Sequence, residues 1–401
     1  MDWQLYLKLS AMMFLEYAIW GAWAPVLAAR LLGPLKMSGK QTGWIYATLP
    51  LACIIFPLIA GWLADKYMST ERLLLMTHLI GAMLLFTAAR KDTFKSLFVV
   101  MLLYSICFAA SMPLVNSLMF QQLGEVFSDD DKAVDAASAN IFIWAPIAWA
   151  LVGYFLTGWR WKFKTGEQGR DCLYLAAILS VIMAVSCLFL PNTPPAKEGN
   201  PIMEAMGMLG EFNFLIFIII SMIIAGLMQF YFLGTAQFMQ DMGIPPKNVP
   251  ASMAIAQAIQ AIATFFLMIA LMEKIGIKWT LTVGAACWLL MYLIYIRSKP
   301  RWLIICSQSL HGLAYVFFII VGQIFVKTVA TKEILKTMQG LIFAATMGIG
   351  LFFGTQFAGI VMDKYRKDEK FQWRQIFMVP AGIAFVCILI FVLFFKLKEA
   401  S

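Results

Sequence analysis

Long apolar runs, separated by short clusters of charged and turn-forming residues, follow one another along the whole chain. A helix needs about 20 apolar residues to cross a bilayer. Of the 401 residues, 62% are apolar and only 13% charged, so a water-soluble globule would expose far more apolar surface than soluble monomers do. The pattern predicts an all-α membrane protein with twelve transmembrane helices. Their approximate ranges are 5–32, 41–65, 72–90, 95–122, 133–158, 171–191, 212–239, 248–274, 278–297, 301–329, 336–363 and 373–396.

The least apolar long stretch in the middle of the chain is the proline-rich segment 191–200. It leaves six predicted helices on each side. We therefore expect an N-terminal half over residues 1–191, a polar linker over 192–211 and a C-terminal half over 212–401. Two six-helix halves joined in this way resemble the major facilitator fold of secondary transporters.

Charge, cysteine usage and motifs exclude several other classes of protein. The net charge is +9, but the basic residues lie in short clusters between apolar runs, as in the collar of a membrane protein, so no nucleic-acid partner is expected. Most cysteines lie inside apolar runs and no CxxC occurs, so we expect no metal and no cofactor. The chain has no phosphate-binding loop, zinc-protease motif or nucleophile elbow, which argues against an enzyme or an ATP-driven pump. The first apolar run lacks the features of a signal peptide and is expected to be retained as a helix.

Two similar segments, Gly61–Tyr67 and Gly359–Tyr365, close the second and eleventh predicted helices. The first resembles the signature loop of the major facilitator superfamily, although its usual Gly-Arg-Arg tail is missing. In that loop the glycine permits close helix approach, and the aspartate can lie at a neighbouring helix N-terminus, where the helix dipole favours an anion. We therefore expect Gly61 and Asp65 to act in conformational gating. The second segment is equally well explained as a polar helix end.

The orientation in the membrane follows from two signals that disagree. The signature loop is cytoplasmic in the superfamily, which places both termini in the cytoplasm. Fewer than half of the 31 Lys and Arg residues would then lie inside, so the positive-inside rule favours the reverse. We follow the signature, because several basic residues lie at helix ends, where they can pair with acids. The expected location is a bacterial inner (cytoplasmic) membrane, with multiple crossings.

Glu16 is the acidic residue that lies well inside a predicted span, within the segment Phe14–Trp23. It shares a helix face with Trp20 and Trp23. Charged side chains inside a membrane are costly and commonly face a cavity or another helix. One interpretation is a protonatable carboxylate near the substrate path, which couples transport to protons. The other is a structural carboxylate that bonds to neighbouring helices.

Amide and aromatic side chains at mid-helix positions predict the substrate site. Gln257 and Gln260 lie three residues apart among alanines, on one helix face. A single intramembrane glutamine often joins helices, whereas this spaced pair favours a lined cavity. Amides bond hydroxyls and ring nitrogens, and aromatic rings stack on flat solutes, so the set suits a small neutral polar solute. The substrate-binding candidates are Asn116, Asn140, Phe142, Trp149, Gln229, Tyr231, Gln257, Gln260, Tyr315 and Phe318.

The two histidines are less informative. His311 lies on the same predicted helix as Tyr315, and a lone histidine there is more commonly a packing residue than a proton relay. His78 lies close to the start of a predicted helix and is a weaker candidate still.

Taken together, the segments Phe14–Trp23, Leu63–Lys66 and Val115–Ser117 resemble the bacterial nucleoside:proton symporters of the major facilitator superfamily. The resemblance runs along nearly the whole chain. It implies import by alternating access, with a nucleoside-sized pocket between the halves. It also carries Asn116, Gln229, Gln257 and Gln260 over as pocket residues, and Trp149 and Tyr315 as aromatic walls.

This chain departs from the well-known nucleoside permeases at four positions. Phe142 stands where they have an arginine, Val316 where they have an aspartate, Gln260 where they have a glutamate, and Glu16 where they have a glutamine. Because two acidic positions are lost and one is gained, we expect the coupling residue to be Glu16.

The sequence therefore predicts a monomeric secondary transporter that moves a small-molecule substrate with a proton across the lipid bilayer, a nucleoside being expected first. The alternatives are a sugar or glycoside transporter of the same fold, a membrane receptor without net flux, and a polytopic enzyme acting on lipid intermediates. The last would need clustered acids, histidines or a metal set at one membrane face, and the sequence has none.

Overall fold

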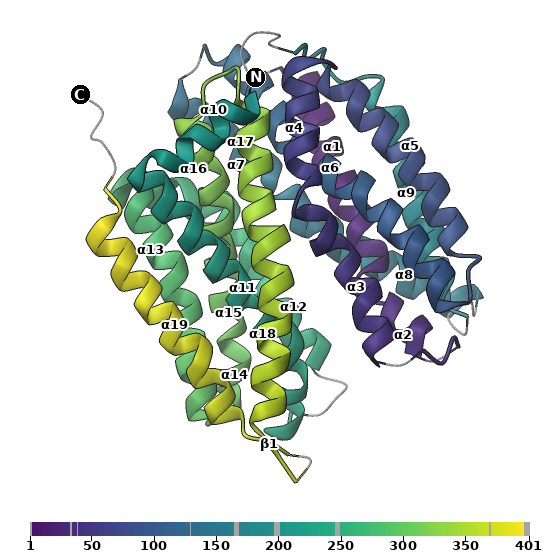
Figure 1. Ribbon diagram of the computed structural model, residues 1–401, viewed down its shortest axis with the longest axis vertical. Helices are drawn as coiled ribbons and strands as arrows, with labels where there is room; N and C mark the ends of the chain where they lie inside the picture. Colours follow the sequence, from purple (N-terminus) through teal and green to yellow (C-terminus); the bar gives the residue numbers. More distant parts are fainter. Residues whose placement is uncertain are drawn as a thin grey trace. The chain divides into compact units, whose positions relative to one another are not determined.

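The computed structural model describes residues 2–32, 34–37, 39–128, 130–163, 168–195, 201–244, 249–368 and 370–396. Within these ranges the chain is helical, apart from the short antiparallel ribbon of β1 (Arg366–Lys367) and β2 (Lys370–Phe371) (Figure 1). It forms two compact units. Unit 1 comprises Met1–Ala205 with Lys327–Ala344, and unit 2 comprises Met206–Val326 with Ala345–Ser401. The centre of the expected linker, residues 196–200, lies outside the described residues.

The helices of unit 1 pack against one another in several pairs. In this unit α1 packs against α8 and α9, α5 against α9 and α6, and α17 against α4. The helices of unit 1 are α1 (Trp3–Trp23), α2 (Leu27–Leu32), α3 (Gly39–Cys53), α4 (Phe56–Lys66), α5 (Thr70–Ala88), α6 (Phe94–Val126), α7 (Asp131–Phe142), α8 (Trp144–Phe163), α9 (Asp171–Cys187), α10 (Pro201–Gly207, which reaches the boundary) and α17 (Leu335–Phe343).

Unit 2 is built around α11 and α13. Helix α13 packs against α19 and α15, and α11 packs against α18 and α19. The elements of unit 2 are η2 (Met208–Gly210), α11 (Phe212–Asp241), α12 (Val249–Ile262), η4 (Ala263–Leu267), α13 (Met268–Arg297), α14 (Arg301–Cys306), α15 (Gln308–Ala314), η5 (Tyr315–Ile320), α16 (Val321–Val329, which crosses the boundary), η6 (Ala344–Gly350), α18 (Leu351–Lys364) and α19 (Trp373–Phe394).

Nine helical stretches of the described residues are long and apolar enough to cross a membrane. They are Gln41–Lys66, Thr70–Ala88, Phe94–Val126, Asp131–Phe163, Phe212–Asp241, Ser252–Arg297, Arg301–Val329, Leu335–Lys364 and Trp373–Phe394. Helix α1 has 21 residues, enough for a crossing, but residues such as Gln4, Lys8 and Glu16 lower its hydropathy. Helix α9 is apolar and slightly shorter, at 17 residues.

One of these stretches, Ser252–Arg297, runs for 46 residues, which is about twice what a bilayer requires. The sequence predicts two helices there, 248–274 and 278–297. Gly276 interrupts the helical backbone between them, with φ 76° and ψ 168°. Glycine adopts such a positive φ without steric cost because it has no Cβ, so the chain changes direction at the position where the sequence predicts a break.

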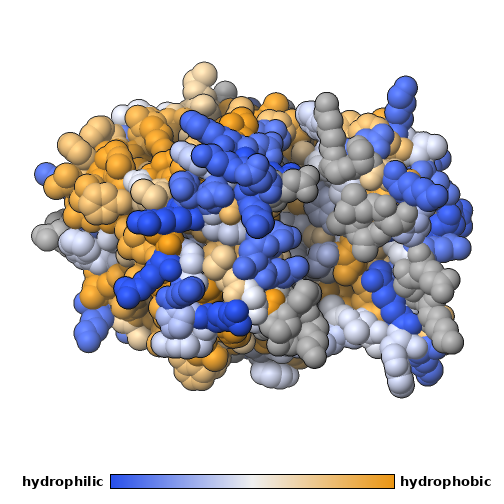
Figure 2. Space-filling view, turned by 90° about the horizontal axis from the view of Figure 1, so that it is seen from below, coloured by the Kyte–Doolittle hydropathy of each residue, from blue (hydrophilic) through white to orange (hydrophobic). Residues whose placement is uncertain are grey.

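The outer surface of the helices carries many large apolar side chains. Examples are Ile80, Met83, Val99, Phe266 and Leu293, each more than two-fifths exposed. At the end of the molecule that carries β1, hydrophilic side chains gather on the face and hydrophobic side chains dominate the left flank (Figure 2). An apolar flank beside a polar end is the arrangement that a bilayer requires.

Candidate functional site

Glu16 lies in the middle of α1 and is 2% exposed. Its two carboxylate oxygens face different helices. Oε1 accepts a hydrogen bond of 2.7 Å from the Ser111 hydroxyl of α6, and Oε2 lies 2.9 Å from Nε2 of His78 on α5. His78 is also 2% exposed. A buried charge needs such partners, because its desolvation is costly.

His78 is tied to a fourth helix of unit 1. Its Nδ1 lies 3.4 Å from the hydroxyl oxygen of Ser180 on α9, and that hydroxyl donates a 2.8 Å hydrogen bond to the backbone carbonyl of His78. The Glu16–His78 pair therefore joins α1, α5, α6 and α9. These four side chains form one connected polar group inside an apolar bundle.

A small recess, too narrow in this structure to hold a water molecule, lies beside the Glu16 carboxylate. Its lining consists of Glu16, Tyr17, Trp20, Phe108 and Met112. Trp20 is the aromatic centre of this region, because its ring lies 6.3 Å from Phe108 and meets Trp149 of α8 edge-on at 5.2 Å. The expected aromatic wall residue Trp149 thus lies near the expected coupling residue. The recess combines flat apolar faces with one titratable carboxylate.

The other candidates in unit 1 lie deeper in the packing. Asn116 is 1% exposed and lies on α6, five residues after Ser111. Phe142 is 2% exposed and meets Phe120 edge-on at 6.0 Å. Asn140 is half-buried near the end of α7, and its backbone carbonyl accepts a 3.4 Å hydrogen bond from the Tyr6 hydroxyl.

In unit 2 the glutamine pair lies where α12 crosses α15. Gln260 is buried and Gln257 half-buried. Gly312 of α15 makes this crossing possible, because a Cβ there would overlap the carbonyl oxygen of Ala256 and lie 2.9 Å from the backbone nitrogen of Gln260. Three residues after Gln260, at Ala263, the helix widens into the π-helical segment η4. Such π-bulges are frequent at functional sites.

The remaining site candidates of unit 2 lie in or near an aromatic cluster around His311. The ring of His311 stacks on Tyr231 at 3.8 Å with 10° between the planes, and its Nδ1 accepts a 3.0 Å hydrogen bond from the indole N–H of Trp288. Since an indole nitrogen can only donate, the proton of His311 resides on Nε2. Phe318 packs edge-on against Trp288 at 6.1 Å, and Gln229 lies two residues before Tyr231 on α11.

Tyr315 is half-buried and begins the π-helical segment η5, which also contains Phe318. Among the expected site positions in unit 2, Tyr315 thus begins one π-helical segment and Gln260 lies three residues before another.

Asp65 lies at the N-terminus of α17, as the signature loop predicts for its aspartate. Its Oδ2 accepts hydrogen bonds from the backbone nitrogen of Thr337 at 2.9 Å and from its hydroxyl at 2.6 Å. Gly61 brings the two helices together, because a Cβ there would lie 2.6 Å from the Lys336 carbonyl oxygen. Both the carboxylate and the glycine are therefore required by one contact between α4 and α17.

The second copy of the segment behaves differently. Asp363 is exposed, and a Cβ on Gly359 would meet nothing within 4 Å. The structure therefore favours the simpler interpretation of this copy, a polar helix end.

Ser111, Ser180 and Trp288 were not among the sequence candidates, and His78 was only a weak one. Sequence spacing could not join them to Glu16 or His311, because they lie on different helices. One signal was available for His78. The chain has only two histidines, and a buried carboxylate requires a polar partner. Helix α5 also begins at Thr70, so His78 lies more than two turns inside it and not near its start.

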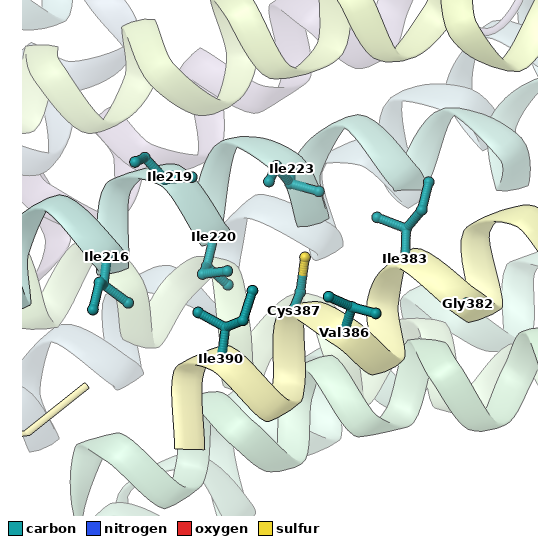
Figure 3. A pocket seen from close by; sticks show the side chains of 9 residues that line it. All are labelled: Ile216, Ile219, Ile220, Ile223, Gly382, Ile383, Val386, Cys387 and Ile390. Carbon is teal, nitrogen blue, oxygen red and sulfur yellow. The ribbon is translucent and has the colours of Figure 1, made fainter. Parts of the chain in front are cut away.

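An apolar groove between α11 and α19 has a volume of about 390 Å³ (Figure 3). Isoleucines from both helices line it, together with Val386, Cys387 and Gly382. It offers no amide, carboxylate or hydroxyl side chain that could orient a polar solute. The groove therefore lacks the chemistry of a binding site for such a solute.

The fold and these polar clusters define a polytopic helical membrane protein. The family model of the nucleoside H+ symporters matches residues 3–400. The chain therefore belongs to the nucleoside H+ symporter family.

Individual proteins agree with this assignment. The nucleoside permease NupG of Escherichia coli (strain K12) is 26% identical over 98% of this chain and 97% of its own length. A crystal structure of the nucleoside transporter NupG is 25% identical, with a TM-score of 0.70 over 99% of this chain and 100% of that one. The proton:xylose symporter XylE of the major facilitator superfamily has a TM-score of 0.72 at 12% identity, over 98% of this chain and 95% of that one, and shares the fold.

Proposed function

We propose that this protein imports a nucleoside together with a proton by alternating access, and that Glu16 is the coupling carboxylate. The observation that carries the proposal is the position of Glu16. It is buried among four helices, in contact with His78, and it lines an aromatic recess. A symporter needs a group that can bind and release a proton beside the solute path, and a buried carboxylate beside aromatic rings supports this role for Glu16.

For the substrate, we propose contacts from the amide and aromatic residues of both units. Nucleosides present hydroxyls and ring nitrogens that amides can bond, and a flat base on which aromatic rings can stack. Supporting features are the Gln257–Gln260 pair and the stacked Tyr231. The proposed substrate-binding residues are Asn116, Asn140, Phe142, Trp149, Gln229, Tyr231, Gln257, Gln260, Tyr315 and Phe318.

For the topology, we propose twelve crossings by a monomer in the bacterial inner membrane, with both termini in the cytoplasm. The kink at Gly276 supports two crossings within Ser252–Arg297, and the lengths of α1 and α9 support one crossing each. The halves 1–191 and 212–401, joined by the linker 192–211, would be the two bodies that alternate. The contact of Gly61 and Asp65 with α17 would act as a gate.

The test is uptake of labelled nucleoside into proteoliposomes that contain the purified protein, with and without an inward proton gradient. We expect accumulation only with the gradient, and a sodium gradient should not replace it. The Glu16→Gln variant should lose gradient-driven accumulation but retain exchange of labelled for unlabelled nucleoside. Gradient-driven accumulation by Glu16→Gln would remove Glu16 from the mechanism.

Exchange also separates the other functions. Exchange of a sugar but not of a nucleoside would indicate a sugar transporter, and binding without exchange would indicate a receptor. Ser111→Ala is the control for the Glu16→Gln variant. It removes one hydrogen bond to Glu16 but leaves the carboxylate able to bind a proton.

A further inference from the structure

The proton-binding unit in unit 1 is larger than one carboxylate. Oε2 of Glu16 and Nε2 of His78 lie 2.9 Å apart, and neither atom has another hydrogen-bond partner among the described residues. Both side chains are 2% exposed. At this distance the carboxylate and the ring can share one hydrogen, so their combined charge is the relevant quantity.

The geometry determines where a proton can be added. When Glu16 is a carboxylate, a neutral His78 places its hydrogen on Nε2, toward the negative charge. The lone pair of Nδ1 is then free. Nδ1 faces the Ser180 hydroxyl oxygen at 3.4 Å, and that hydroxyl donates its own hydrogen to the His78 carbonyl. An N–H at Nδ1 would therefore point at the lone pairs of an acceptor.

The surroundings of the pair carry little charge. Tyr104 of α6 and Cys187 of α9 lie within electrostatic range of Glu16, and both types of side chain are neutral near pH 7. From α8, Trp149 and Val152 pack against α1 at Gly21. Tyr17 of α1 lines the recess.

Three acidic groups on the neighbouring elements have partners of their own. Glu71, on α5, accepts a hydrogen bond of 3.0 Å from the backbone nitrogen of Thr193. Asp131 and Asp135 of α7 pair with Lys327. The charge of the Glu16–His78 pair is therefore the local charge that a proton changes.

We propose that His78 is the second half of the coupling site and that the transported proton is bound at its Nδ1. This inference rests on the proposed function. A proton adds to the Nδ1 lone pair and forms an N–H bond toward Ser180, and the net charge of the pair changes from −1 to 0. Release of the proton breaks the same bond and restores −1. Ser180 is a positioning residue that accepts the new N–H.

The change in charge supplies a reason for coupling. The deprotonated pair is a net negative charge within an apolar bundle, which is costly. Protonation removes this charge, so the two states of the pair favour different packing of α1, α5, α6 and α9. The recess lined by Glu16 and Trp20 lies beside these helices. A solute bound there would respond to the change in helix packing.

The test uses His78→Gln in the full chain, reconstituted in proteoliposomes. A glutamine amide can still donate to Glu16, but it does not titrate near neutral pH. We expect nucleoside exchange within about twofold of the wild type. Gradient-driven accumulation should fall by at least about tenfold, because a change of one unit in the pKa of proton binding corresponds to a tenfold change in occupancy. The pH dependence of uptake should shift as well.

Matched variants separate a titrating role from a structural one. Ser186→Ala, on the same helix as Ser180, removes a hydroxyl that donates to the Ile182 carbonyl of its own helix and should retain the wild-type pH profile. The double variant Glu16→Gln with His78→Gln should be no worse than Glu16→Gln alone, because residues that act as one unit are not additive. If His78→Gln does not reconstitute, Ser180→Ala provides the same comparison and should shift the pH profile without abolishing exchange.

Three outcomes distinguish the two hypotheses. A wild-type protein that exchanges no nucleoside would contradict the proposed function itself. Wild-type exchange, with unchanged accumulation and pH profile in His78→Gln, would overturn only the role of His78. If Ser180→Ala loses exchange and accumulation in parallel, without a shift in the pH profile, the polar group of Glu16, His78, Ser111 and Ser180 has only a structural role.

Discussion

At the scale of single residues, two buried carboxylates of unit 1 each have a specific partner on another helix. Glu16 contacts His78 and Ser111, and Asp65 binds Thr337. In an apolar environment an unsatisfied polar group costs several kcal/mol. The positions of these residues are therefore fixed by their partners as much as by their own helices.

Asp65→Asn should weaken the contact between α4 and α17. The variant keeps an oxygen that can accept from Thr337 but loses the negative charge at the helix N-terminus, which should cost about 1–2 kcal/mol. We expect a lower melting temperature for the detergent-purified protein and slower nucleoside exchange.

Asp363→Asn is the control, because Asp363 occupies the same place in the second copy of the segment but is exposed. It should melt like the wild type. Equal melting temperatures for both variants would show that the Asp65 charge does not stabilise the N-terminus of α17.

At the scale of elements, glycines decide which helices can cross closely. Gly312 permits the crossing of α12 and α15, and Gly226 and Gly354 permit that of α11 and α18, where an added Cβ would overlap the opposite backbone. Small residues are typical of helix contacts in membranes, because close packing replaces the hydrophobic effect there. The glutamine pair on α12 is thus held by a backbone contact.

Gly312→Ala should separate α12 from α15 and displace Gln260. Overpacking of this kind costs about 1–3 kcal/mol, so both the melting temperature and the affinity for nucleoside should fall. Gly359→Ala is the matched control on α18, since its Cβ would meet nothing within 4 Å, and it should leave both quantities unchanged. A Gly312→Ala protein with wild-type affinity would indicate that this crossing does not position the site.

At the scale of the whole molecule, ligand binding should stabilise the fold by mass action. A nucleoside at about 100 times its dissociation constant adds about 2.7 kcal/mol to the free energy of unfolding. We expect a screen of nucleosides, nucleobases, sugars and amino acids to raise the melting temperature with nucleosides most. The double variant Gln257→Ala with Gln260→Ala should lose most of this increase, and an unchanged increase would show that these amides only pack.

Much of the architecture follows from the sequence, because a bilayer imposes its thickness on every helix. The apolar runs predict the long helices, and Gly276 lies within the predicted break between two of them. The signature segment also predicts the contact of Asp65 with a helix N-terminus, although not which helix. The partner, Thr337, lies 272 residues away in sequence, and no local pattern connects the two.

The sequence by itself determined that the chain is a helical membrane protein, that Glu16 is buried and that a family of transporters has its pattern. The first two are consequences of composition and periodicity, which act within one helix, and the third is a resemblance carried by short motifs. Only the tertiary structure decided that Glu16 faces His78, that Ser180 faces the other nitrogen of that ring, and that Gly312 brings Gln260 against α15. The rotation of each helix about its axis is set by packing against several neighbours at once, and that information is distributed over the whole chain.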